Sequence, residues 1–315
     1  MSTHATKPER RLEGEPGTEA TPLRFVTAAS LFDGHDAAIN VMRRLIQASG
    51  AEVVHLGHNR SVAEIVKAAV EEDADAIAVS SYQGGHVEYL TYMVDMLRER
   101  GAGHIAVFAG GGGTITKDEI AQLEAYGVER VYHPDDGLSL GLRGMIDDVV
   151  GRAARARVAT VLPDAAPSAG DPLAVARMLS AIEDGLVADE ELAALCASWE
   201  EAGRSVPVIG ITGTGGAGKS TVTDELLSRF LQYLPDVRVA VVAVDPTRRR
   251  TGGALLGDRI RLNSLLRGHT YMRSLATRRQ HSATSEVLGP AIAFLRACGF
   301  DLVLAETAGI GQSDS

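Results

Sequence analysis

The residues best suited to chemistry stand at positions 213–220, where the chain reads Gly-Thr-Gly-Gly-Ala-Gly-Lys-Ser. This Gly-x-x-x-x-Gly-Lys-Ser spacing lies between an apolar run, Val206–Thr212, and a helical pattern, Thr221–Tyr233. Glycine-rich backbone can wrap phosphates with its N–H groups, a lysine can reach the outer phosphates, and a serine hydroxyl can bind Mg²⁺. A flexible glycine turn is the alternative, but the strand-to-helix context favours a nucleoside triphosphate site. The predicted nucleotide-binding residues are Gly213, Gly215, Gly216, Ala217, Gly218, Lys219, Ser220 and Thr221, with Lys219 as the catalytic group.

Three acidic residues are predicted to serve the same site. Asp245 and Glu306 each end a short apolar run, and Asp258 follows a glycine-rich loop. The carboxyl ends of parallel strands face one crevice, and Mg²⁺ prefers oxygen ligands together with water. We therefore expect Asp245, Asp258 and Glu306 to hold Mg²⁺ together with Ser220, although the two aspartates could instead cap turns. The segment between Asp245 and Asp258 is predicted to be a switch loop, with a solvated basic loop as the alternative.

Unusual residues also occur in three loops of the first half of the chain. The first loop contains Asp33-Gly-His35, the second begins at Ser80, and the third is the run Gly110–Gly113. Consecutive glycines let a large flat ligand approach the backbone. A carboxylate beside a histidine is typical of a metal-ligating imidazole, although a lone loop histidine is more often a surface residue. The glycine spacing is not that of a dinucleotide site, and no cysteine or second histidine has zinc-like spacing.

Alternating short apolar runs and amphipathic segments indicate an α/β fold for residues 23–150. Five such strands connected by helices predict a flavodoxin-like, doubly wound parallel sheet. The predicted strands are Arg24–Ala29, Glu52–Leu56, Ala76–Ser80, Ile105–Ala109 and Arg130–Tyr132.

The rest of the chain predicts a second domain. Residues 1–22 are expected to be a flexible tail and residues 151–171 an aperiodic linker. Residues 172–315 are expected to hold two helices, the second with Asp189 as its N-cap, followed by a P-loop domain. Its predicted strands are Val206–Thr212, Arg238–Val244 and Asp301–Ala305, with an irregular stretch between the last two. Because a P-loop domain has more strands than these, we expect the chain to be the front part of a longer protein.

Composition excludes several other classes of protein. The net charge of −10 argues against a general nucleic-acid surface, which needs basic stripes. No apolar stretch approaches the roughly 20 residues of a membrane span, and the polar first residues do not resemble a secretory signal. The two cysteines, Cys196 and Cys298, are expected to be buried thiols of a cytoplasmic protein.

The three loops of the first domain resemble the cobalamin-binding domain of acyl-CoA mutases. That family has Asp-x-His-x-x-Gly, then Ser-x-Leu, then Gly-Gly, and the residues matching this pattern are Asp33, His35, Ser80, Gly110 and Gly111. The resemblance implies that His35 is the lower ligand of cobalt and that Asp33 hydrogen-bonds the imidazole. It also implies that Ser80 meets the displaced cofactor tail and that the glycines line its channel. Two positions depart from the family pattern: Ala38 replaces its final glycine and Tyr82 its leucine.

The second domain resembles the G-protein chaperone that accompanies such mutases, and the order of domains is similar to the front of the fused isobutyryl-CoA mutase family. The matching stretches are Gly213–Ser220, Val244–Thr247, Thr251–Arg259 and Glu306–Gln312. The resemblance implies a mutase that uses adenosylcobalamin, with a fused GTPase that needs Mg²⁺ and manages cofactor loading. It also implies a carboxyl-terminal acyl-CoA-binding barrel in the same polypeptide and a homodimer. Two alternatives are a corrinoid carrier or sensor with a loading GTPase, and a P-loop ATPase joined to an unrelated domain.

Overall fold

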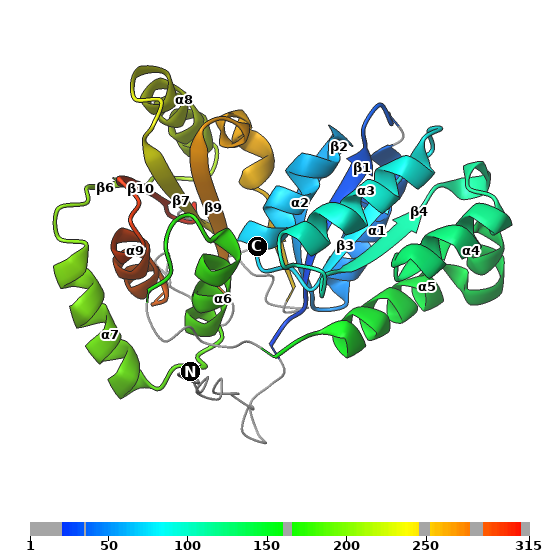
Figure 1. Ribbon diagram of the computed structural model, residues 1–315, viewed down its shortest axis with the longest axis horizontal. Coiled ribbons are helices and arrows are strands. Elements are labelled where there is room, and N and C mark those ends of the chain that lie inside the picture. Colours follow the sequence, from blue (N-terminus) through cyan, green and yellow to red (C-terminus); the bar gives the residue numbers. More distant parts are fainter. Residues whose placement is uncertain (1–20, 35, 160–165, 246–252, 278–285, 310–315) are drawn as a thin grey trace, which may run out of the picture.

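The computed structural model describes residues 21–34, 36–159, 166–245, 253–277 and 286–309, which form two adjoining α/β units (Figure 1). His35 and the segment 246–252 of the predicted switch loop therefore lie outside the described residues. Within the described residues, no helix combines the length and the apolar character needed to cross a membrane.

The first unit contributes five strands, in the order β5-β4-β3-β1-β2, to a parallel sheet. This is the flavodoxin-like order, so the predicted fold class is confirmed. The strands are β1 (Arg24–Ser30), β2 (Glu52–Arg60), β3 (Ala76–Ser80), β4 (Ala106–Gly110) and β5 (Arg130–Tyr132). The helices are α1 (Asp36–Ala48), α2 (Val62–Glu71), α3 (His86–Glu99), α4 (Lys117–Tyr126) and α5 (Pro134–Ala156), with a short 3-10 turn η1 (Gly112–Thr114).

Both faces of this sheet are covered by helices, because side chains along each strand alternate between two cores. Val26 of β1 packs in a core with residues of α2 and α3, whereas its neighbour Phe25 packs with residues of α1 and α5. Burial on both faces explains why the strands are nearly continuous apolar runs. The carboxyl ends of β1, β3 and β4 consequently open at one edge, where the three unusual loops emerge.

The second unit has its own parallel sheet, with strand order β6-β10-β7-β9. Its helices are α6 (Pro172–Glu183), α7 (Asp189–Ala202), α8 (Lys219–Tyr233) and α9 (Leu288–Ala297). Its strands are β6 (Val208–Ile211), β7 (Arg238–Asp245), β9 (His269–Ala276) and β10 (Leu302–Glu306). Two 3-10 turns, η2 (Arg259–Arg261) and η3 (Asn263–Leu266), precede β9.

Three expectations from the sequence are wrong in detail. The stretch expected to be irregular contains β9, α9 and the short strand β8 (Ala254–Leu256). Helix α5 continues past Gly151 into the predicted linker, because Ala153 is fully buried and Arg152 pairs with Asp148 at 3.0 Å. The N-cap of α7 is Ala188, so Asp189 is instead the first helical residue.

Strand β8 joins the two units, because it pairs with β2 rather than with the sheet of the second unit. The pairing is parallel, with Ala254 opposite Glu52 and Leu256 opposite Val54. Ala254 and Leu256 are fully buried and belong to the hydrophobic core of the first unit. The chain that follows the segment 246–252 therefore extends the first sheet before returning to the second unit.

A buried network of ion pairs lies at the same junction. Glu72, at the end of α2, accepts hydrogen bonds from Arg259 Nε at 3.1 Å and from Ser274 N at 3.0 Å. Glu183, at the end of α6, is 2.8 Å from both Arg24 Nη2 and Arg273 Nη2. Charged groups are buried without large cost only when they are paired and hydrogen-bonded, so these contacts restrict the units to one relative arrangement.

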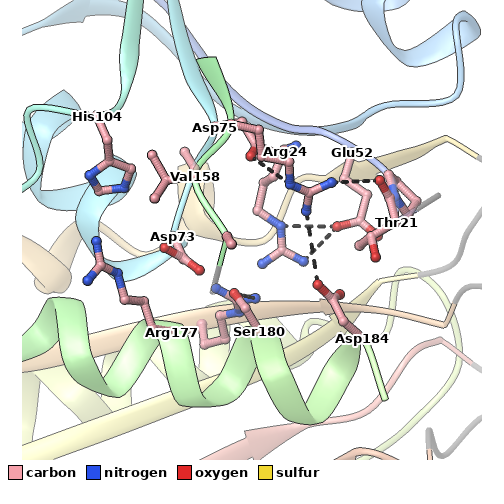
Figure 2. A pocket seen from close by; sticks show the side chains of 15 residues that line it. Thr21, Arg24, Glu52, Asp73, Asp75, His104, Val158, Arg177, Ser180 and Asp184 are labelled. Atoms are coloured by element: carbon pink, nitrogen blue, oxygen red, sulfur yellow. Dashed lines mark hydrogen bonds and ion pairs between the residues drawn. The ribbon is translucent and has the colours of Figure 1, made fainter. Parts of the chain in front are cut away.

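The network borders a small polar cavity of about 40 Å³ between the first unit and α6. Figure 2 shows Arg24 hydrogen-bonded to Asp75 and Glu52, with Ser180 of α6 and Asp184, the residue after α6, on the other side. Its lining combines arginines and carboxylates from both units, so it is continuous with the ion network.

Candidate functional site

The P-loop connects β6 to α8 and has the backbone conformation that a phosphate site needs. Gly216 and Gly218 adopt positive φ angles of 79° and 86°, and Gly218 is the N-cap of α8. The first N–H groups of α8 therefore face the loop, and helix N-termini bind anions. Lys219 Nζ lies over the loop, 3.3 Å from the Gly213 carbonyl oxygen and 3.4 Å from that of Thr214. This places the ammonium at the mouth of the predicted nucleotide site.

Ser220 connects two of the predicted acidic residues. Its Oγ is 3.2 Å from Asp258 Oδ1 and 2.9 Å from Glu306 Oε1, and all three side chains are buried. Thr223, one turn along α8, donates a hydrogen bond to Glu306 Oε2 at 3.0 Å. Sequence reasoning missed Thr223, although its spacing of one helical turn from Lys219 was a usable signal.

Asp245 lies at the end of β7 and has a different contact. Its Oδ2 accepts a hydrogen bond from Gly257 N at 3.1 Å, so it fixes the turn that leads into Asp258. Burial, followed by the neighbouring Asp258 carboxylate, raises the pKa of Asp245 well above its usual value. The same two causes raise the pKa of Glu306.

These acidic residues and Ser220 fit a magnesium ion bound together with phosphate. Within the described residues, no three His, Cys, Asp or Glu side chains are arranged to hold a metal on their own. In a magnesium site here, Ser220 Oγ, phosphate oxygens and water would supply part of the coordination shell, which suits Mg²⁺ because this ion retains several waters. A cation here would relieve the repulsion between Asp258 and its two acidic neighbours.

The first unit contains a cavity of about 370 Å³ at the carboxyl ends of β3 and β4, between α1 and α5. Its size falls in the range of small-molecule and cofactor sites. Ser80, Gly110 and Gly111 line it, as does Tyr82, and the remaining lining is largely apolar. The structure thus brings together three of the predicted first-domain residues.

The polar groups of this cavity fit a ligand. Ser80 Oγ is buried and, among the described residues, has no hydrogen-bond partner. A buried hydroxyl without a partner is costly, so a ligand group that accepts or donates a hydrogen bond there would be favoured.

The glycine run forms a close-fitting wall of the same cavity. A Cβ added to Gly111 would lie 2.0 Å from Ser81 O, and Gly112 has a φ of 57° and lies against the Tyr82 ring. Only glycine fits these two positions. By contrast, a Cβ at Gly113 would meet no atom within 4 Å.

Asp33 is almost fully buried in the loop after β1, and its Oδ2 accepts a hydrogen bond from Tyr82 N at 2.8 Å. The carboxylate therefore ties the first loop to the second, a role that sequence reasoning did not predict. Sequence reasoning also missed the outer wall of the cavity, to which Tyr132 and Met145 contribute. Pro134, which follows His133 and begins α5 shortly after β5, was the signal in the sequence for a helix at this wall.

Comparisons with known proteins match both units. Residues 23–138 match the family described as B12 binding domain, and residues 175–315 match Methylmalonyl Co-A mutase-associated GTPase MeaB.

Several curated relatives have the name fused isobutyryl-CoA mutase. The chain is 53% identical to the one from Geobacillus kaustophilus, over 93% of this chain and 28% of that protein. It is 55% identical to the one from Cupriavidus metallidurans and 53% identical to the one from Nocardia farcinica. Each of these two matches covers 94% of this chain and 27% of the relative, so the chain spans less than a third of the length of these proteins.

The raised pKa of Asp245 predicts a pH-dependent stability. A carboxyl group whose pKa is higher in the folded than in the unfolded state favours folding below its ordinary pKa, and this contribution is lost as pH rises through the raised value. We expect Asp245→Asn to raise the thermal unfolding midpoint of the nucleotide- and metal-free chain by about 2–4 °C at pH 8. The gain should vanish towards pH 4. Asp236→Asn, at an exposed position, is the control, and parallel pH profiles for wild type and Asp245→Asn would contradict the prediction.

Proposed function

We propose that this chain is part of an acyl-CoA mutase. Its B12 binding domain would bind adenosylcobalamin, and its GTPase domain of the MeaB kind would bind GTP. The similarity to fused isobutyryl-CoA mutases supports a carbon-skeleton mutase of the isobutyryl-CoA/n-butyryl-CoA type. The acyl-CoA would bind to a barrel that is not part of this chain but belongs to the same polypeptide. We further propose a homodimer that works in the cytoplasm.

The observation that carries the cobalamin proposal is the unpartnered Ser80 Oγ in the 370 Å³ cavity. Ser80, Gly110 and Gly111 would hold the cofactor tail, and the buried Asp33 would keep the two adjacent loops together. His35 would ligate cobalt, an assignment that rests on the family pattern. Bound adenosylcobalamin would supply the radical chemistry of the rearrangement, while the protein binds, orients and excludes water.

In the second domain, the residues around the P-loop would position GTP and neutralise its charge. Catalysis of phosphoryl transfer consists mostly of such positioning and electrostatic stabilisation. Lys219 would contact the outer phosphates, and Ser220, Asp258 and Glu306 would hold Mg²⁺ directly or through water. Asp245, the remaining predicted ligand, would hold Mg²⁺ with them directly or through water and would also fix the turn at Gly257. GTP hydrolysis would then control cofactor loading.

Two single substitutions separate the proposed functions. Gly111→Ala forces a Cβ against Ser81 O, so in the full-length protein it should weaken cobalamin binding at least about tenfold and leave GTP hydrolysis intact. Lys219→Ala should lower the kcat of GTP hydrolysis by about 10²–10³ and leave cobalamin binding intact. Absorbance titration and phosphate release measure the two activities.

Gly113→Ala is the matched control for the cavity, because its Cβ enters open space. Equal loss of both activities in both variants would contradict separate sites. Cobalamin binding and GTP hydrolysis without isomerisation of acyl-CoA by the full-length protein would instead favour a corrinoid carrier.

The cobalt ligand can be tested by spectroscopy. In the cob(II)alamin form, coordination by a protein histidine gives a nitrogen hyperfine pattern, which we expect to be absent in His35→Ala. His55→Ala is the control, because the His55 ring already faces Thr27 Oγ1 at 2.9 Å. An unchanged hyperfine pattern in His35→Ala rules out the assignment.

A further inference from the structure

The segment from Gly253 to Arg259 belongs to both units at once. Its first part, β8, is a strand of the first unit's sheet, with Leu255 opposite Val53 of β2. Gly253 permits this pairing, because a Cβ there would lie 2.1 Å from Gln47 O and 2.8 Å from Ala51 O. The backbone of the segment is thus seated directly against the cobalamin-binding domain.

The next residues of the same segment turn into the nucleotide site. Gly257 N donates a hydrogen bond to Asp245 Oδ2, and Asp258 Oδ1 is 3.2 Å from Ser220 Oγ of the P-loop. Only one residue, Gly257, separates the last residue of β8 from Asp258.

Arg259 returns directly to the first unit. Its guanidinium is buried and reaches the two carboxylates that end α2, with Nη1 2.9 Å from Glu71 Oε2 and Nε 3.1 Å from Glu72 Oε1. Its Nη2 donates to the Met272 carbonyl oxygen of β9 at 2.6 Å. A fork-shaped guanidinium with partners on both units holds a defined geometry that a lysine cannot reproduce.

From this arrangement we infer that Arg259 is a positioning residue for the nucleotide site and couples it to the cobalamin-binding domain. Consecutive Cα atoms are about 3.8 Å apart, so Asp258 cannot shift towards a metal or phosphate without rotating or straining the Arg259 anchor. Arg259 thereby presents Asp258 to Ser220 and makes nucleotide affinity depend on the first domain.

The inference rests on the proposed function, because it requires both ligands to bind. The route from Asp258 runs through β8 and β2 to β1, whose last residues precede Asp33. Thermodynamic linkage makes the coupling reciprocal, so cobalamin must change nucleotide affinity by the same factor that nucleotide changes cobalamin affinity.

The test measures this factor in the full-length protein. The dissociation constant of a non-hydrolysable GTP analogue with Mg²⁺ is determined with and without saturating adenosylcobalamin. For the wild type we expect a change of about 5- to 50-fold. In Arg259→Lys and in Glu71→Gln the change should fall to about twofold or less, because each variant loses the paired geometry but keeps the packing.

Arg24→Lys is the matched control. Arg24 is equally buried and also bridges the units, through Glu52, Glu72 and Glu183, but among the described residues it does not pair with Glu71, and it is far in sequence from the nucleotide site. The Arg24→Lys variant should show the same change in nucleotide affinity on cobalamin binding as the wild type. Circular dichroism establishes that each variant is folded, and the milder Glu71→Gln carries the test if Arg259→Lys unfolds.

Three results would overturn the inference. The first is that both Arg259→Lys and Glu71→Gln keep the wild-type change in nucleotide affinity on cobalamin binding. The second is that Arg24→Lys loses this change as fully as Arg259→Lys and Glu71→Gln do. The third is a wild-type affinity that does not respond to cobalamin although both ligands bind. A wild-type protein that fails to bind one of the ligands would overturn the proposed function as well, which distinguishes the two failures.

Discussion

The buried ion network between the two units is the contact on which the rest of the structure depends. Three arginines, from β1, η2 and β9, meet four glutamates, from β2, α2 and α6. Such a network adds little net stability compared with apolar packing, but removing one partner leaves a buried charge and costs about 3–5 kcal/mol. The network therefore fixes the relative orientation of the two units, because only one arrangement pairs every buried charge. The P-loop and the cavity of the first unit are placed relative to each other by this requirement.

Much of the fold could be predicted from local pattern, because each β-α unit of the first domain carries its own periodicity. The strands Ala76–Ser80 and Arg130–Tyr132 were predicted to the residue, since turns and apolar runs define them locally. Strand β8 could not be predicted, because three residues flanked by glycines become a strand only through their partner β2, some 200 positions earlier. Strand β9 was hidden by Arg273, a charged residue that is buried only because Glu183 and Glu72 meet it.

The candidate sites also contain residues that the sequence indicates and residues that only the structure reveals. The sequence indicates the P-loop, the strand-end acids Asp245 and Glu306 and the loop acid Asp258, since strand ends on one side of a parallel sheet share a crevice. The structure brings Asp258 and Glu306 to Ser220, and their binding roles stay predictions. Thr223 and the support that Asp245 gives to Gly257 emerged only from the structure. Arg259 ends the family-like stretch Thr251–Arg259, but only its burial beside Glu71 and Glu72 reveals its part in the junction.

We conclude that β8, which leads towards the P-loop, is an integral strand of the first unit's sheet. Native-state hydrogen exchange of β8 and β2 amides at increasing denaturant tests it most directly, because strands of one cooperative unit open together. We expect the amides of residues 254–256 and those of β2 paired with them to share one opening free energy and one denaturant dependence. Rapid exchange of β8 while β2 stays protected would contradict the claim.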